Sequence, residues 1–268
     1  MYEEHFGLRP RPFGDPASLE DFVSLPSRDS TRRRLRYGLE HGQGPALLFG
    51  PSGTGKTLLA RALAVELGAR TAHLTFPAMP SAELMDYLAD ELDAPRLDHQ
   101  PGLSGSIRRL QVALATSARR GDRPLLIVDE AHLIDDPSTF EALRLLLNFA
   151  THGPPDLALL LVGGPEMPLH LPPALSDRLT ARCLLAPLTL TESAAYVLGR
   201  LERAGASGPL FDPPALAELH RHANGLPRRL NRLADLALLI AYAQGVDRPD
   251  LRTVLAAARE ATFDPLAA

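Results

Sequence analysis

Short apolar runs alternate with longer amphipathic segments through the first two thirds of the chain, and this alternation restricts the possible folds. Five runs have the length and apolar content of buried strands: Ala46–Gly50, Thr71–Phe76, Leu125–Asp129, Leu157–Val162 and Arg182–Ala186. Segments of helical periodicity separate them: Thr57–Leu67, Ser81–Leu92, Ser106–Arg119 and Ser138–Ala150. Because strands that alternate with helices need crossover connections, the pattern predicts an α/β fold with a five-stranded parallel sheet covered on both faces.

The pattern changes after about Leu188. Four further segments are helical, with no strand between them: Thr191–Arg203, Pro214–His222, Pro227–Gln244 and Pro249–Ala261. Thr191, which precedes Glu192, and Asp212, which precedes two prolines, resemble helix N-terminal signals. We therefore expect an α/β core domain over residues 1–187 and a small all-helical domain over residues 188–268.

Composition limits the classes of function. The formal net charge of −4 argues against a general affinity for nucleic acids or anionic membranes, although it leaves room for a local basic patch. The N-terminal stretch MYEEHFGLRPRPF does not resemble a signal peptide, and apolar stretches such as LADLALLIAYA fall short of the roughly 20 residues that span a bilayer. Cys183, the only cysteine, lies in an apolar run and is expected to be a buried hydrophobe. We expect a soluble, cytoplasmic protein without membrane insertion.

The sequence GPSGTGKT at Gly50–Thr57 fits the phosphate-loop (Walker A) pattern G-x-x-x-x-G-K-[ST], between a predicted strand and a predicted helix. In such a loop the glycines let backbone N–H groups wrap around phosphates, Lys56 reaches the β and γ phosphates, and the Thr57 hydroxyl binds Mg²⁺. The candidate ATP-binding residues are Gly50, Pro51, Ser52, Gly53, Thr54, Gly55, Lys56, Thr57 and Leu58.

Lys56 is the only lysine among the 28 Lys and Arg residues. Arginine is a wide planar fork, whereas an ammonium is a compact point charge that fits between phosphate oxygens in a tight loop. Retention of lysine at this one position supports a loop that binds nucleotide.

The sequence LLIVDEAH places two carboxylates, Asp129 and Glu130, at the end of a predicted strand, where open α/β sheets bind ligands. We expect Asp129 to hold Mg²⁺ through a water molecule and Glu130 to orient and polarise the attacking water. His132 is expected to be a helix or loop residue beside the site. The letters DEAH occur in a helicase motif, but no other helicase motif accompanies them.

Arginines are candidates for stabilising negative charge on the γ phosphate. Arg178, in a predicted loop, is favoured over Arg182, which enters a strand, as a residue acting on a neighbouring subunit's ATP. Arg228 begins a predicted helix after Gly225 and Pro227, so it can approach the nucleotide from the helical domain. Arg229 and Arg232 are weaker candidates.

Together these motifs resemble an AAA+ ATPase, and more narrowly the general secretion pathway protein A family of the ExeA type. The similar stretches are MYEEHFGL, SLPSRDSTRRRLRYGL, EALRLLLNFAT, LLLVGGPEM and GLPRRLNRLADLALLIAYAQG, spread over about residues 1–245. The resemblance implies a P-loop NTPase core followed by a helical lid, ATP and Mg²⁺ as cofactors, and assembly into a ring or filament with ATP at subunit interfaces. It also suggests relatedness to transposition-regulator ATPases.

Two departures from this family affect the expected function. The family usually has Gln where this chain has Gly164, at the end of the fourth strand, so a polar group that senses the γ phosphate is missing there. Asn148, which matches an Asn of the family, is a candidate substitute, and hydrolysis is expected to be slow. Secretion members continue into a transmembrane helix and a peptidoglycan-binding domain; this sequence stops at Ala268 with neither, so we do not expect their envelope-anchoring role.

Three functions remain open. The first is a cytoplasmic assembly or regulatory ATPase for a secretion-like or pilus-like protein complex of unknown identity. The second is a DNA-associated ATPase, for which Arg108 and Arg119 share a helix face and Arg32–Arg34 with Arg36 form another basic cluster. A solvated face explains such charges more often, and no aromatic residue is expected to interleave with them as a stacking platform. The third is a nucleotide-switched scaffold with negligible hydrolysis.

Overall fold

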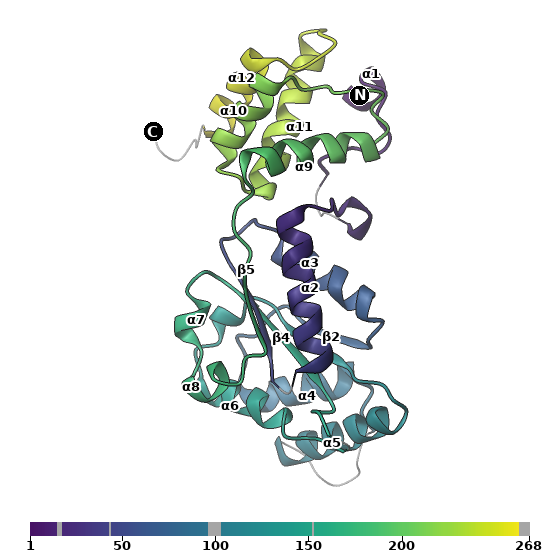
Figure 1. Ribbon diagram of the computed structural model, residues 1–268, viewed down its shortest axis with the longest axis vertical. Helices are drawn as coiled ribbons and strands as arrows, with labels where there is room; N and C mark the ends of the chain where they lie inside the picture. The colour runs from purple at the N-terminus through teal and green to yellow at the C-terminus, as the bar shows by residue number, and fades with distance from the viewer. Residues whose placement is uncertain (15–17, 43, 96–102, 152, 263–268) are drawn as a thin grey trace. The chain divides into compact units, whose positions relative to one another are not determined.

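The five predicted strands form one parallel sheet in the computed structural model, which describes residues 1–14, 18–42, 44–95, 103–151 and 153–262 (Figure 1). The strands are β1 (Ala46–Phe49), β2 (Thr71–Leu74), β3 (Leu125–Val128), β4 (Ala158–Gly163) and β5 (Ala181–Leu184), in the order β2-β3-β4-β1-β5. Every pairing is parallel, which confirms the predicted α/β class. The predicted strand ends differ from these bounds by one or two residues.

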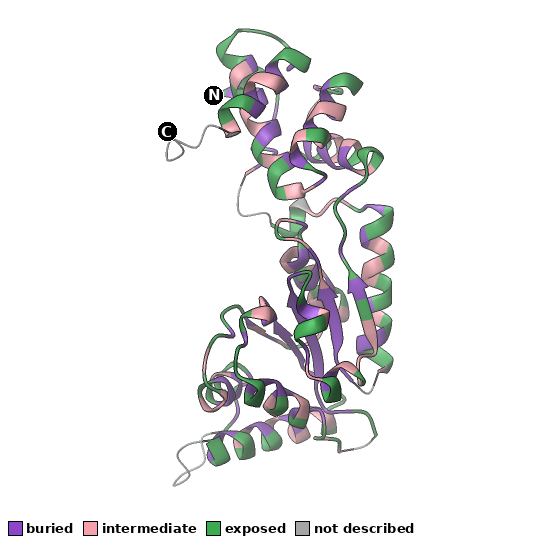
Figure 2. Ribbon diagram, turned by 90° about the vertical axis from the view of Figure 1, so that its left-hand side faces the viewer, coloured by how far each residue is buried: buried purple, intermediate pink, exposed green. Residues whose placement is uncertain are grey.

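Burial explains why the strands appear in the sequence as continuous apolar runs. All residues of β3 and β4 are buried, as expected for central parallel strands covered on both faces (Figure 2). The edge strand β5 instead alternates, with Cys183 buried and its neighbours Arg182 and Leu184 exposed. Burial raises the pKa of the Cys183 thiol, which confirms the expected buried hydrophobe.

Helices cover this sheet. The longer ones are α2 (Pro26–His41), α3 (Lys56–Leu67), α4 (Ser81–Glu91), α5 (Leu103–Arg119) and α6 (Pro137–Leu146). The short ones are η2 (Ala131–Leu133), α7 (Met167–His170) and α8 (Pro173–Ser176). Buried leucines of α4, α5 and α6 share one apolar core with β2, β3 and β4. On α2, a Cβ at Gly38 would lie 2.8 Å from the Cβ of Ala181, so this helix packs directly beside β5.

The chain forms two compact units, which we describe separately. The α/β unit comprises Ser27–Pro51 and Leu59–Leu185, and the helical unit comprises Met1–Pro26, Ser52–Leu58 and Ala186–Ala268. The domain boundary at residue 187 stays a prediction from the sequence, and residues 263–268 lie outside the described part of the chain. No helix in the described segments combines the length and the apolar content needed to cross a membrane.

The helical unit begins with α1 (Tyr2–His5) and η1 (Leu19–Asp21) and continues with α9 (Leu190–Arg203), α10 (Pro213–Ala223), α11 (Pro227–Ala243) and α12 (Leu251–Thr262). Tyr2 and Arg11 both donate hydrogen bonds to the carboxylate of Asp235 on α11, with the Tyr2 Oη–Oδ1 distance at 2.5 Å and the Arg11 Nε–Oδ1 distance at 2.9 Å. These contacts hold the N-terminal segment against α11.

Capping residues fix the starts of two of these helices. The Glu192 N–H donates to Thr189 Oγ1 at 3.2 Å, and the Thr189 N–H donates to the Glu192 carboxylate at 3.3 Å. The predicted signal at Thr191 was wrong: the cap is Thr189, two residues earlier, and the helix begins at Leu190, because this reciprocal cap requires Glu at the third helical position. Asp212 is confirmed as a cap, since its Oδ1 accepts from the Ala215 N–H at 2.8 Å.

Candidate nucleotide-binding site

Three chain segments leave the sheet at the same edge, because the carboxyl ends of parallel strands point one way. Gly50 follows β1, Asp129 follows β3, and Gly164 follows β4, which lies between those two strands. The Gly50 N–H donates to the carbonyl of Gly163 at 3.2 Å, so the phosphate-loop sequence begins beside the end of β4. This edge is where open α/β sheets place their ligands.

The loop between β1 and α3 has the backbone that its glycines predict. Gly53 and Gly55 have φ values of +80° and +92°, a region that residues with a Cβ rarely adopt. Lys56, which is 7% exposed, is the first residue of α3, so the loop runs directly into a helix N-terminus. A polyphosphate requires tight backbone turns that let N–H groups approach it, a lysine side chain and the N–H groups of a helix start, and this loop has all three features. The nine candidate residues Gly50–Leu58 are all described.

Arg228 lies on this loop within the helical unit. Its backbone N–H donates to the Gly53 carbonyl at 3.2 Å, and its Nη1 donates to Ser52 Oγ at 3.4 Å. Pro227 precedes it at the first position of α11, where proline is well tolerated because that N–H has no helical partner. The structure therefore brings Arg228 to the phosphate loop, while Arg229 and Arg232 are exposed on the same helix.

The two carboxylates at the end of β3 lie in different surroundings. Asp129 is 4% exposed; its Oδ1 accepts the Glu130 N–H at 3.0 Å, and His73 Nε2 lies 3.5 Å from its Oδ2. The Glu130 side chain is 47% exposed, and its backbone has a φ of +49°. Such left-handed backbone at a residue with a side chain costs conformational free energy, and residues of this kind cluster at functional sites. A held oxygen ligand beside an accessible carboxylate suits the predicted Mg²⁺ and water-polarising roles.

His132 and Gly164 meet next to Glu130. The Gly164 N–H donates to His132 Nδ1 at 3.3 Å, and the same nitrogen lies 3.4 Å from Glu130 Oε2. A Cβ at position 164 would overlap the carboxylate of Glu166, which fills the space over the glycine. The sequence predicted that His132 lies beside the site. Its hydrogen bond to Gly164 could not be predicted, because it depends on the pairing of β3 with β4, which are far apart in the sequence.

The two remaining candidates in the α/β unit contact each other. Arg178, after α8, donates from Nη1 to Asn148 Oδ1 at 3.1 Å. Arg182 instead has its guanidinium carbon 5.8 Å from the centroid of the Phe49 ring, a cation–π contact with β1. Of these two arginines, the structure therefore brings only Arg178 to the candidate Asn148.

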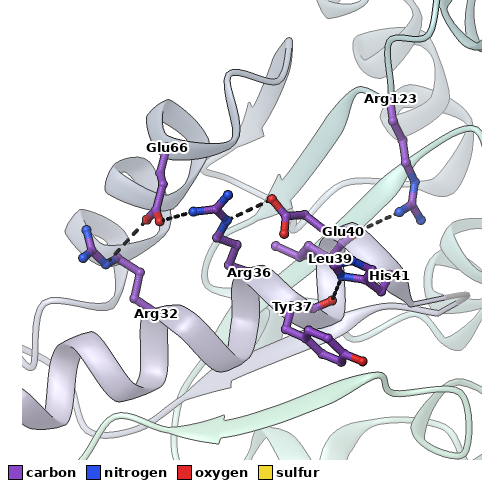
Figure 3. A network of polar contacts seen from close by, with 8 residues as sticks. All are labelled: Arg32, Arg36, Tyr37, Leu39, Glu40, His41, Glu66 and Arg123. Atoms are coloured by element: carbon purple, nitrogen blue, oxygen red, sulfur yellow. Dashed lines mark hydrogen bonds and ion pairs between the residues drawn. The ribbon is translucent and has the colours of Figure 1, made fainter.

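The basic cluster on α2 differs from the sequence prediction (Figure 3). Arg36 pairs with Glu40 at 2.9 Å and with Glu66 at 2.8 Å. Tyr37, which is 69% exposed, stacks on His41 with ring centroids 4.7 Å apart and an interplanar angle of 24°. The expectation that no aromatic side chain accompanies the arginines is therefore wrong. The missed signal is the four-residue spacing of the two rings, which places both on one helix face.

Fold and family define the class of protein. The chain has the P-loop NTPase fold of the AAA+ type, and the family described as "AAA domain" matches residues 39–170. It is 36% identical over 252 residues to general secretion pathway protein A of Aeromonas hydrophila, which covers 91% of this chain and 46% of the relative. The chain is thus an AAA+ protein resembling the general secretion pathway protein A family, and it spans about half the length of that relative.

Solved structures agree on the fold. The Cdc6p protein of Pyrobaculum aerophilum is similar with a TM-score of 0.74 and 19% identity, covering 94% of this chain and 71% of its own. The Aeropyrum pernix ORC1 protein in complex with DNA has a TM-score of 0.68 and 21% identity, covering 94% and 69%. The Thermotoga maritima RuvB Holliday junction branch migration motor has a TM-score of 0.58 and 19% identity, covering 92% and 74%.

Substitution of Arg228 tests its role at the loop. Arg228→Ala should weaken ATP binding roughly tenfold or more, because a hydrogen bond to a charged group contributes about 1.5–3 kcal/mol. Titration with a fluorescent ATP analogue measures this affinity. Arg229→Ala is the matched control, since it removes the same charge one residue further along α11 and should leave the affinity unchanged. Equal affinities of the two variants would contradict the assignment.

Proposed function

We propose that this protein binds MgATP and hydrolyses it to ADP and phosphate. The observation that carries the proposal is the shared sheet edge, at which the phosphate-loop sequence leaves β1 and the Asp129–Glu130 pair ends β3. Lys56 and the loop N–H groups bind the β and γ phosphates, and Thr57 with a water on Asp129 holds Mg²⁺. When bound, Mg²⁺ neutralises charge that develops on the phosphate oxygens.

Glu130 is the residue that acts on water in this proposal. Its half-exposed carboxylate accepts a hydrogen bond from the attacking water and orients it in line with the bond to the leaving ADP. The buried Asp129, whose Oδ1 is already bonded to the Glu130 N–H, suits a fixed metal-holding role instead. The buried carboxylate thus holds the metal ion, and the exposed carboxylate acts on water.

A homo-oligomer, as a ring or filament, places Arg178 on the ATP of a neighbouring subunit. Within one chain the guanidinium bonds a neutral amide oxygen of Asn148, a contact worth about 0.5–1.5 kcal/mol. A phosphate oxygen is a stronger acceptor for the same fork, so assembly can redirect Arg178. Asn148 is then released and can contact the γ phosphate of its own chain, in place of the side chain that Gly164 lacks.

In the cell, such an ATPase would act in the cytoplasm as an assembly or regulatory factor for a secretion-like or pilus-like protein complex. The similarity to general secretion pathway protein A over 91% of this chain supports this role. The glycine at position 164 supports slow ATP turnover. If hydrolysis is negligible, the protein acts as a scaffold that is switched by nucleotide binding alone.

Glu130→Gln separates binding from hydrolysis. The amide keeps the size of the side chain but cannot accept the water's proton, so turnover should fall at least about a hundredfold with ATP affinity retained. Phosphate release and ATP titration are the two measurements. Glu83→Gln, an exposed glutamate in the first turn of α4, is the control and should behave as wild type. Undiminished turnover of Glu130→Gln would overturn the site.

Mixed oligomers test the role of Arg178. Arg178→Ala subunits keep Glu130, and Glu130→Gln subunits keep Arg178. An active site that has both residues therefore forms only at an interface between the two kinds of subunit. Mixing two nearly inactive variants should restore part of the wild-type ATPase rate. Activity of the mixture equal to the sum of its parts would contradict action across subunits.

A second candidate function, DNA association, is favoured by the exposed face of α2. Arg33, Arg34 and Tyr37 are exposed along this helix, and Tyr37 with His41 presents a stacked pair of rings. Arginines beside an aromatic platform are typical of surfaces that bind single-stranded nucleic acid. On α5, Arg108 and Arg119 are also exposed, although Arg119 donates to Thr116 Oγ1 within its own helix.

Salt dependence decides this candidate. Fluorescence anisotropy of a labelled single strand should give affinity that falls steeply with salt, and Arg33→Ala/Arg34→Ala should reduce the logarithmic slope by about 1.4. Tyr37→Ala should weaken binding at every salt concentration. Arg252→Ala/Arg259→Ala, which removes two exposed arginines of α12, is the charge-matched control. Absence of any shift with ATP-loaded protein at low salt would reject DNA association.

A further inference from the structure

His132 lies among three groups at the carboxyl edge of the sheet. It belongs to η2, directly after Glu130, and its side chain is 27% exposed. Its Nδ1 accepts the Gly164 N–H at 3.3 Å and lies 3.4 Å from Glu130 Oε2, while its Nε2 lies 4.0 Å from Glu166 Oε1. One ring therefore lies beside the residues that follow β3 and β4 and near Glu166, which precedes α7.

The two neighbours of Nδ1 make incompatible demands. The Gly164 N–H can only donate a hydrogen bond, whereas an ionised Glu130 carboxylate can only accept one. A ring nitrogen carries either a lone pair or a proton, so it can satisfy only one of the two. Gly164 is buried at the end of β4, and a buried backbone N–H without an acceptor is strongly unfavourable. The lone pair therefore belongs on Nδ1 and the proton on Nε2.

This tautomer has a consequence for Glu130. A lone pair at Nδ1 offers the carboxylate no proton, so the imidazole does not capture Glu130 in a hydrogen bond. The ring still lies in contact with the carboxylate and limits its rotamers, while the φ of +49° fixes the stem of the same side chain. Glu130 is thus held in place with its oxygens available to water.

The opposite side of the ring faces the space over Gly164. A Cβ on this glycine would overlap the Glu166 carboxylate, so no side chain from position 164 occupies this space. The Nε2 of His132 lies 4.0 Å from that carboxylate, so the ring places a polar nitrogen near the end of β4. This nitrogen belongs to a residue of η2 and not to a residue of β4.

We propose that His132 is the positioning residue for Glu130, held by the Gly164 backbone in its Nε2–H form. The proposal rests on the proposed ATP hydrolysis, because positioning matters only if Glu130 polarises water. The form of the ring can be measured without any turnover.

Nitrogen NMR of the ¹⁵N-labelled, nucleotide-free chain reads the proton position directly. At about pH 8, where an ordinary imidazole is neutral, His132 should show a proton on Nε2 and a bare Nδ1. The His132→Asn spectrum identifies the signals by their loss. Glu130→Gln should leave the tautomer unchanged, because Gly164 determines it. A proton on Nδ1 in the wild type would overturn the proposal.

Kinetics of three substitutions test the positioning. His132→Ala should lower kcat about tenfold with the KM for ATP changed less than about twofold, because the ring lies beside the carboxylate that acts on water. Asn can place an acceptor near the Nδ1 position and should recover most of kcat, whereas Gln, one bond longer, should not. Unchanged kcat in His132→Ala, or equal recovery by Gln, would refute the positioning role.

His170→Asn is the matched control. His170 is the last residue of α7, and its Nε2 lies 2.8 Å from the carbonyl of Ile134, directly after η2, so kcat should remain at the wild-type value. Wild-type protein with no turnover above that of Glu130→Gln would reject the proposed function, and the NMR result would then decide the form of the ring by itself.

Discussion

The parallel pairing of β4 with β1 on one side and β3 on the other is the constraint on which the candidate site depends. In register, Phe49 lies opposite Gly163 and Val128 lies opposite Leu161, so the three strands end within a few residues of one another. The complete burial of β3 and β4 makes a shift of register expensive, because it would expose leucines to water. Groups at sequence positions 50, 129 and 164 are brought to one edge by that packing.

At this edge, backbone groups determine what side chains can do. The Asp129 carboxylate is engaged by the N–H of the next residue, and the His132 ring by the N–H of Gly164. These donors belong to the ends of buried strands and have little freedom to move. At position 164 the backbone N–H is the donor at this edge, and η2 presents the ring that accepts from it.

Much of the architecture could be predicted from sequence, because periodicity reports burial directly. The continuous apolar runs of β3 and β4 indicated parallel strands, and the loop pattern between β1 and α3 indicated its own backbone, as the φ values of Gly53 and Gly55 bear out. The helix start at Thr191 was wrong, since a reciprocal cap selects the residue three before Glu192. The pairing of Arg178 with Asn148 and of His132 with Gly164 could not be predicted, because each joins chain segments about thirty residues apart through tertiary packing.

The buried position of Lys56 has a further consequence for the chemistry of the whole chain. It is the only side-chain amine among 28 basic Lys and Arg residues, and it is 7% exposed at the start of α3. Arginine carries the positive charge of the protein surface, where it cannot be acylated or joined to ubiquitin as lysine can. Any modification of a lysine side chain in this sequence can therefore occur only at Lys56, within the phosphate loop itself.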